Sequence, residues 1–106
     1  MYIELTNKDD LDIFIPTGLS PNGDGLNDLF IIPEFEYYLN YKQIELRIIN
    51  RWGELVFEDN NYQNNWGGMA NKGARAGSLL DSGVYYYLLT IEGISKQLTG
   101  NVYINK

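Results

Sequence analysis

The chain contains no cysteine and no histidine among its 106 residues. Without cysteine it has no disulfide framework, no thiolate zinc site and no cysteine nucleophile. Without histidine it lacks the commonest general base near neutral pH and the commonest transition-metal ligand. No serine therefore has a histidine to activate it, and we expect that the protein is not an enzyme. Hard cations that bind through oxygen atoms, such as calcium, are not excluded.

Basic residues are also few, because eight lysines and arginines stand against 14 acidic residues and give a net charge of −6. The eight are scattered along the chain and form no basic stripe. Affinity for nucleic acid rests on cations that neutralise phosphates, so we expect no nucleic-acid partner. We also expect no small-molecule substrate, and a monomeric domain.

No apolar run approaches the ~20 residues that a membrane-spanning helix needs. Residues 1–4 show neither the basic nor the apolar region of a signal peptide. An export signal would therefore lie elsewhere in a longer protein. We interpret residues 1–106 as a single domain from the C-terminal part of such a secreted protein, with residues 1–10 as a linker or a first strand.

What the chain does contain is strand-forming residues. Hydrophobic residues make up 44% of the chain and aromatic residues 14%, including nine tyrosines. Tyrosine and β-branched residues favour strands, and no stretch has a helical composition. We expect an all-β fold, an immunoglobulin-like antiparallel β-sandwich of about seven strands.

Period-two alternation between turn signals places the expected strands. They are residues 11–15, 29–32, 44–48, 55–57, 84–91 and 98–105, with a further short strand near Tyr62. Leu55 and Phe57 are expected to face inward. Residues 84–91 are apolar on both faces, typical of a strand covered on two sides or bearing an exposed aromatic row. Residues 35–41 are a loop or a single helical turn, and residues 58–83 form a long loop anchored by Tyr62 and Trp66.

Residues 21–28 (Pro-Asn-Gly-Asp-Gly-Leu-Asn-Asp) form a dense turn with oxygen-bearing side chains at alternating positions. Such a pattern suits calcium, which is therefore a possible but not a required cofactor. The candidate ligands are Asn22, Asp24, the Leu26 carbonyl and Asp28. Ser20 and Ile31 occupy positions where a full calcium loop carries acids. The alternative, which we favour, is a turn in which Asn and Asp side chains bond their own backbone.

Three features are candidate partner-binding surfaces. Arg51 and Trp52 stand at a hairpin tip, where Trp52 is either an exposed recognition anchor or, as its usual burial favours, a cap on the core. Residues 85–87 are three tyrosines, which pack in the core and under the long loop or form a sugar-binding platform. Tyr103 and Lys106 belong to a final strand that either ends at a sheet edge, where it can add to a partner's sheet, or pairs only within its own domain.

Five motifs along the chain, weak singly, are specific when they occur in order. They are residues 21–28 with Phe30, residues 50–53 with 56–57, Tyr62 with Trp66, residues 83–87, and residues 100–104. From about Phe14 to Lys106 the chain resembles the gliding motility-associated C-terminal domain, the type B sorting domain of the type IX secretion system. It departs from that family at residues 66–68, where the family usually has Trp-Asp-Gly, and at residues 80–83, where the family usually has a proline.

The resemblance implies a function that the composition does not show. Such a domain sits at the end of large secreted or cell-surface proteins and directs their outer-membrane translocation and surface attachment. Its partners would be the type IX translocon and the associated outer-membrane barrel proteins. The alternative is an adhesive module that binds carbohydrate or protein at the cell surface.

Overall fold

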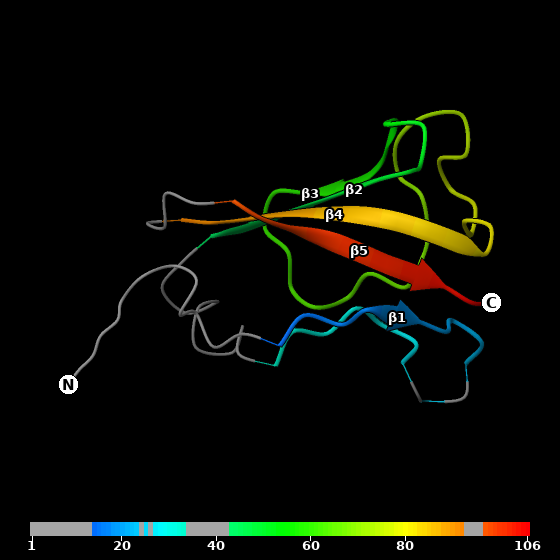
Figure 1. Cartoon of the computed structure of the whole chain (residues 1–106), viewed down its shortest axis with the longest axis horizontal. Helices are drawn as coiled ribbons and strands as arrows, with labels where there is room; N and C mark the ends of the chain where they lie inside the picture. The colour runs from blue at the N-terminus through cyan, green and yellow to red at the C-terminus, as the bar shows by residue number, and fades with distance from the viewer. Residues whose placement is uncertain (1–13, 24, 26, 34–42, 93–96) are drawn as a thin grey trace.

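The computed structural model describes residues 14–23, 25, 27–33, 43–92 and 97–106. These residues contain strands and no helix, which confirms the all-β class, and none of them forms a helix that could cross a membrane. The strands are β1 (Gly18–Leu19), β2 (Ile44–Ile49), β3 (Leu55–Asp59), β4 (Gly83–Ile91) and β5 (Leu98–Ile104). They form one sheet in the order β1-β5-β4-β2-β3 (Figure 1). Seven strands and the second sheet of a sandwich are not confirmed within the described ranges.

The sheet is mixed rather than purely antiparallel. β4 pairs antiparallel with both β2 and β5, and β2 pairs antiparallel with β3. β1, however, runs parallel to β5, with Gly18 opposite Tyr103 and Leu19 opposite Ile104. The expectation of an entirely antiparallel arrangement is therefore wrong at this edge. A parallel pair requires a long connection, and here almost the whole chain provides it.

Alternation correctly predicted the buried faces of β2 and β5. One face of the sheet carries the core, to which β2, β4 and β5 contribute Ile44, Leu46, Ile48, Tyr85, Tyr87, Leu89, Ile91, Val102 and Ile104. β4 is covered on one side only, because Val84 and Tyr86 are 43% and 40% exposed on the other face. Gly100 lies opposite Tyr87, whose ring occupies the space that a Cβ at this position would need.

A bulge in β3 changes which residue is buried there. Ile48 pairs with Phe57 and Ile49 pairs with Leu55, so Val56 is an extra residue between the two pairs. Two residues of a bulged strand oppose one on its partner, which disturbs strict alternation. Val56 is consequently buried and Leu55 only half-buried. The expected inward orientation of Leu55 is wrong, whereas Phe57 does pack against the core.

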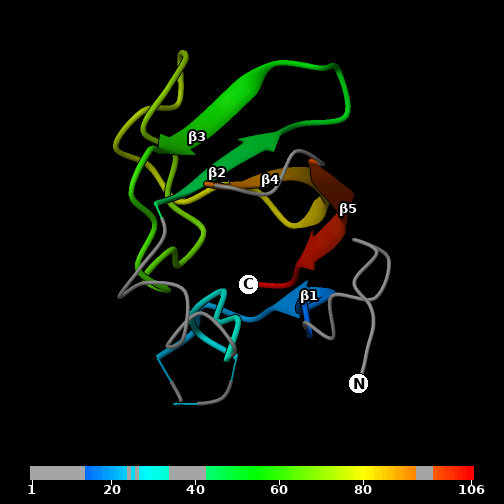
Figure 2. The same cartoon turned by 90° about the vertical axis from the view of Figure 1, so that its left-hand side faces the viewer.

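Among the residues that the structure describes, irregular segments and no second sheet cover the buried face (Figure 2). Outside the sheet the core contains Phe30, Ile32, Tyr62, Trp66, Ala70 and Leu80. The expected strand at residues 29–32 does alternate, since Phe30 and Ile32 are buried while Leu29 and Ile31 are exposed. It belongs to no strand ladder. Its backbone bonds elsewhere: Phe30 N–H donates to the Trp66 carbonyl (2.8 Å), and the Asn64 amide bonds both N–H and C=O of Ile32 (3.0 and 3.1 Å).

Four other segments were expected: a strand at residues 11–15, a loop or helical turn at residues 35–41, a short strand near Tyr62 and a long loop at residues 58–83. Phe14 and Ile15, the described part of the expected strand at residues 11–15, lie outside any strand. Residues 35–41 fall outside the described residues. No strand forms near Tyr62, although its N–H donates to the Ile44 carbonyl at 2.8 Å. Within residues 58–83 the extended pairing amounts to a single bridge between Met69 and Leu79, beyond the last residues of β3 and the first of β4.

Tyr62 and Trp66 anchor the long loop as predicted, at 0% and 2% exposed. The Tyr62 hydroxyl donates to the Phe30 carbonyl (2.5 Å) and accepts from Trp66 N–H (3.0 Å). Burial raises the pKa of Tyr62, so the hydroxyl stays a neutral donor. The rings of Phe30 and Trp66 meet edge to face at 6.0 Å. The loop is thus joined to residues 27–33 by both hydrogen bonds and ring packing.

Removing this hydroxyl tests its role. We expect Tyr62→Phe to lower the free energy of unfolding by about 1–3 kcal/mol, because a buried carbonyl and a buried N–H each lose a partner. Thermal and urea unfolding measure the loss. Tyr86→Phe, which removes a hydroxyl from the exposed face, is the matched control and should leave stability unchanged. Equal effects of the two variants would contradict this assignment.

Candidate functional site

The hairpin between β2 and β3 presents Trp52 at its tip. The Asn50 side-chain oxygen accepts hydrogen bonds from the N–H groups of Trp52 (3.0 Å) and Glu54 (2.9 Å), and Gly53 adopts a φ of +84°. The turn therefore holds the tip away from the core, and Trp52 is 71% exposed. The Arg51 guanidinium lies 4.4 Å from the centre of the indole ring. The favoured interpretation of Trp52 as a cap on the core is wrong, because the side chain is exposed at the hairpin tip.

The end of the chain lies beside the start of β4. Tyr103 pairs with Val84 and is 47% exposed. Lys106 N–H donates to the Ser82 hydroxyl (3.2 Å), and its ammonium lies 3.6 Å from a carboxylate oxygen of Asp81. The last residue is therefore held against the domain. Of the two alternatives for the final strand, β5 is not the outermost strand of the sheet, because β1 pairs with its final residues.

Both regions meet at residues 81–84. A small groove of about 100 Å³ is lined by Arg51 and Trp52 on one side and by residues 81–85 on the other. Arg51, Trp52, residues 81–84, Tyr103 and Lys106 are called the C-terminal corner below. Figure 1 shows the hairpin tip, the start of β4 and the end of β5 at the same end of the sheet. The structure thus brings together all four residues predicted to bind a partner.

Residues 81–84 were missed at the sequence level. Asp81 and Ser82 end the long loop and Val84 lies in β4, and no local pattern marks them as functional. They become part of the corner only through the register of β4 with β5. The departure from the family pattern at residues 80–83 was the one signal that pointed to this segment.

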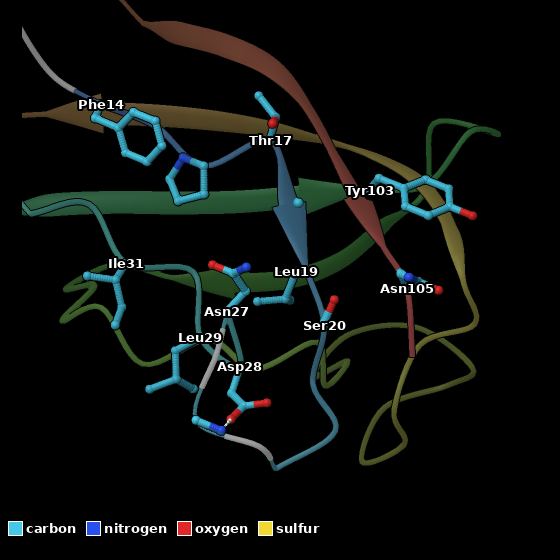
Figure 3. Close-up of a pocket in the computed structure, with 13 residues that line it drawn as sticks. Phe14, Thr17, Leu19, Ser20, Asn27, Asp28, Leu29, Ile31, Tyr103 and Asn105 are labelled. Carbon is cyan, nitrogen blue, oxygen red and sulfur yellow. Dashed lines mark hydrogen bonds between the residues drawn. The ribbon is translucent and has the colours of Figure 1, made fainter.

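A larger groove lies next to β1, with a volume of about 670 Å³. Its exposed apolar side chains are Phe14, Leu29, Ile31 and Tyr103, exposed by 64%, 41%, 45% and 47%. Figure 3 shows the first three on one side of β1 and Tyr103 on the other. Clustered exposed apolar side chains of this kind mark interaction sites. Tyr103 belongs to both surfaces, so the groove continues the C-terminal corner.

Of the three consecutive tyrosines, one reaches the surface. Tyr85 and Tyr87 are 8% and 9% exposed, and burial raises the pKa of both hydroxyls. Tyr86, at 40% exposed, borders a shallow apolar groove of about 320 Å³ together with Ile49 and Leu88. Core packing therefore accounts for two of the three rings. A platform made of several stacked tyrosines is not formed by this strand.

A family model for the CHU_C type IX secretion signal domain matches residues 13–104. The chain belongs to this family. The resemblance to the type B sorting domain is thereby confirmed. No curated protein and no solved structure matches the chain. The family is described by a secretion signal and not by a reaction.

The secretion signal domain departs from its family pattern at Gly67, and packing there explains why a side chain is disfavoured. A Cβ at Gly67 would lie 3.3 Å from the Leu29 side chain and 3.4 Å from the Asp28 carbonyl. The distance to Leu29 is tighter than ordinary van der Waals contact, and the distance to the Asp28 carbonyl is at its lower limit. The aspartate usual in the family would therefore require the Leu29 side chain to shift by a few tenths of an ångström.

The turn at residues 21–28 is held together by one carboxylate. Oδ1 of Asp28 accepts from the N–H groups of Asn22 (3.1 Å) and Gly23 (2.9 Å), and Oδ2 accepts from Gly25 N–H (2.6 Å). These are the bonds of a turn that satisfies its own backbone. Asp24 and Leu26 fall outside the described residues, and the residues that are described contain no cluster of three acidic side chains able to hold a metal. Calcium binding stays a prediction.

Replacing Asp28 separates the two interpretations of this turn. We expect Asp28→Ala to lower the melting temperature equally in calcium and in chelator, because three backbone N–H groups lose their acceptor. Asp24→Ala, measured in parallel by differential scanning fluorimetry, reports on a cation directly. A loss of stability for either variant that appears only when calcium is present would assign the carboxylate to a metal.

Ion pairs hold the end of the chain at the corner. Two guanidinium nitrogens of Arg75 lie 3.0 and 3.4 Å from the two oxygens of Asp81. This hydrogen-bonded guanidinium, with a smaller contribution from Lys106, lowers the pKa of Asp81 below its ordinary value. Tyr85 donates to the Asp81 carbonyl at 2.9 Å and fixes its backbone. Asp81 therefore connects the long loop, β4 and the last residue.

The lowered pKa predicts how this connection responds to acid. A carboxylate whose pKa is lower in the folded state stabilises that state above the ordinary aspartate range of about 3.9, and the effect is lost as the pH falls through the folded value. We expect the amide resonance of Ser82 to shift in a titration below pH 4, as the link of Asp81 and Ser82 to Lys106 loosens. Asp81→Asn should remove that shift. An unchanged titration in Asp81→Asn would contradict the role of this carboxylate.

Proposed function

We propose that this secretion signal domain is the C-terminal sorting signal of a larger exported protein. The export machinery would recognise the folded domain through the C-terminal corner. The observation that supports the proposal is the meeting of Trp52, Tyr103 and Lys106 around residues 81–84. Trp, Tyr and Arg dominate the residues that carry binding energy at protein interfaces. An exposed tryptophan with a stacked arginine is therefore a fitting anchor for a protein partner.

The partners that we propose are those expected for the family. The type IX translocon and its associated outer-membrane barrel proteins would bind the corner, carry the attached protein across the outer membrane and leave it at the cell surface. The domain would act as a monomer, because one copy contains the whole corner. The groove next to β1 supports the same function, since Tyr103 joins it to the corner and its exposed side chains are apolar.

An adhesive role is the second candidate, and the same exposed Trp52 favours it. Aromatic faces bind sugars as well as proteins, and a domain delivered to the cell surface meets both. The two roles make different demands on Trp52. Sorting needs it during export, whereas adhesion needs it only afterwards.

A reporter fusion tests the sorting role. Residues 2–106 are placed behind a signal peptide and a fluorescent protein in a host that has the type IX system. We expect the reporter at the cell surface, and Trp52→Ala to reduce the surface fraction at least about tenfold, as loss of an interface anchor does. Met69→Ala, which truncates another exposed apolar side chain (45% exposed), is the matched control and should export normally.

Two results would overturn the proposal. One is a wild-type reporter that stays in the periplasm, and the other is a Trp52→Ala reporter that is exported like the wild type. In the second case, glycan-array binding of the purified domain that disappears in Trp52→Ala would establish the adhesive role instead. Tyr103→Ala and Lys106→Ala extend the map of the corner, with unfolding curves to confirm that each variant folds.

A further inference from the structure

The two sides of β5 differ in how their backbone groups are satisfied. Tyr103 and Asn105 donate their N–H groups to the carbonyls of Thr17 and Leu19, on the side of β1. Because backbone groups alternate along a strand, the odd-numbered residues of β5 face this side and the even-numbered residues bond to β4. Thr99 and Asn101 therefore direct their N–H and C=O groups away from β4.

Nothing in the described part of the chain pairs with Thr99 and Asn101 on that side. β1 covers only Tyr103 and Ile104 of β5. Continued backward, the parallel register would place Pro16 opposite Asn101, but no backbone hydrogen bond joins residues 14–17 to Thr99 or Asn101. The pairing consequently stops where the chain enters β1. Both residues are exposed, so two N–H and two C=O groups form an open edge halfway along β5.

The opposite edge of the sheet is closed, which makes the open one distinctive. In β3, the Asn71 side-chain oxygen accepts from Glu58 N–H (2.9 Å), and its amide nitrogen donates to the Glu58 carbonyl (2.9 Å). The backbone N–H of Asn71 also donates to the Val56 carbonyl at 2.9 Å. One asparagine thus takes the place of a neighbouring strand. Proteins commonly block edges in this way to prevent unwanted pairing.

We propose that the open edge at Thr99 and Asn101 receives an extended segment of the export machinery, which adds to the sheet as a strand. The inference rests on the proposed sorting function and specifies how the partner binds. The occupant follows from the chemistry, because alternating N–H and C=O groups at strand spacing are complementary to another extended backbone. The apolar groove at Ile49, Tyr86 and Leu88 flanks this edge on the exposed face and would take a side chain of the added strand.

The position of the edge links it to the corner. Along β5, Asn101 precedes Tyr103 by two residues, and the side chains of both point to the exposed face. A partner strand on Thr99 and Asn101 would therefore end close to Tyr103, where β1 begins to cover β5. The backbone pairing would supply affinity that tolerates many cargo proteins, while Trp52 and Tyr103 would supply specificity.

A proline at Asn101 tests the backbone directly. Asn101→Pro removes an N–H that bonds to neither β4 nor β1, so the domain should keep its fold, as checked by its unfolding curve. We expect the surface fraction of the reporter to fall about tenfold, which corresponds to about 1.4 kcal/mol. Asn101→Ala, the matched control, loses the side chain but keeps the N–H and should export normally. If Asn101→Pro does not fold, Thr99→Pro makes the same test.

Each other outcome has a definite meaning. Normal export of a folded proline variant, with the wild type also exported, overturns strand addition and leaves the sorting function standing. Failure of the wild type to be exported overturns both. A concentration-dependent dimer in sedimentation that Asn101→Pro abolishes would assign the edge to a second copy of the chain and overturn the proposal. Amide exchange in the free domain checks the premise: Thr99 and Asn101 should exchange quickly, with Gly100 and Val102 protected between and beside them.

Discussion

The fold depends on one buried hydroxyl that joins two segments lying outside the sheet. Tyr62 donates to the carbonyl of Phe30 and accepts from the N–H of Trp66, and its side chain is fully buried. A five-stranded sheet with one apolar face needs a cover, and here the cover consists of irregular chain. Its backbone polar groups must be satisfied locally. Tyr62 and the Asn64 amide do this, which lets Phe30 and Trp66 pack on the sheet without a second one.

Alternation was a sound guide where a strand is antiparallel and buried on one face, as in β2 and β5, because a slip of one residue would reverse every side chain. It misled at residues 29–32, which alternate equally well but bond to Asn64 and Trp66 in place of a strand. The pattern reports which side chains are buried and not what the backbone pairs with. The parallel pairing of β1 with β5 depends on contacts distant in sequence, so it leaves no local signal. The bulge at Val56 lies within a hairpin, where it interrupts the alternation that the prediction relied on.

The candidate site was predictable residue by residue and not as an arrangement. Composition singled out Trp52, and position singled out Lys106, but their meeting at residues 81–84 requires the register between β4 and β5 and the reach of Asp81. The habit of tryptophan to be buried is an average over many proteins. At Trp52 a specific hydrogen-bonded turn around Asn50 keeps the side chain exposed.

The C-terminal corner is made of residues that are far apart in the sequence, and this limits what kind of sorting signal it can be. Residues 51 and 106 both come close to residues 81–84 only after the hairpin, the long loop and the last strand have all reached their places. A sorting signal of the kind proposed above could not be cut out and moved as a short tail, and a misfolded copy would not display it. A transport system that binds this surface would therefore recognise only proteins whose sorting domain has folded.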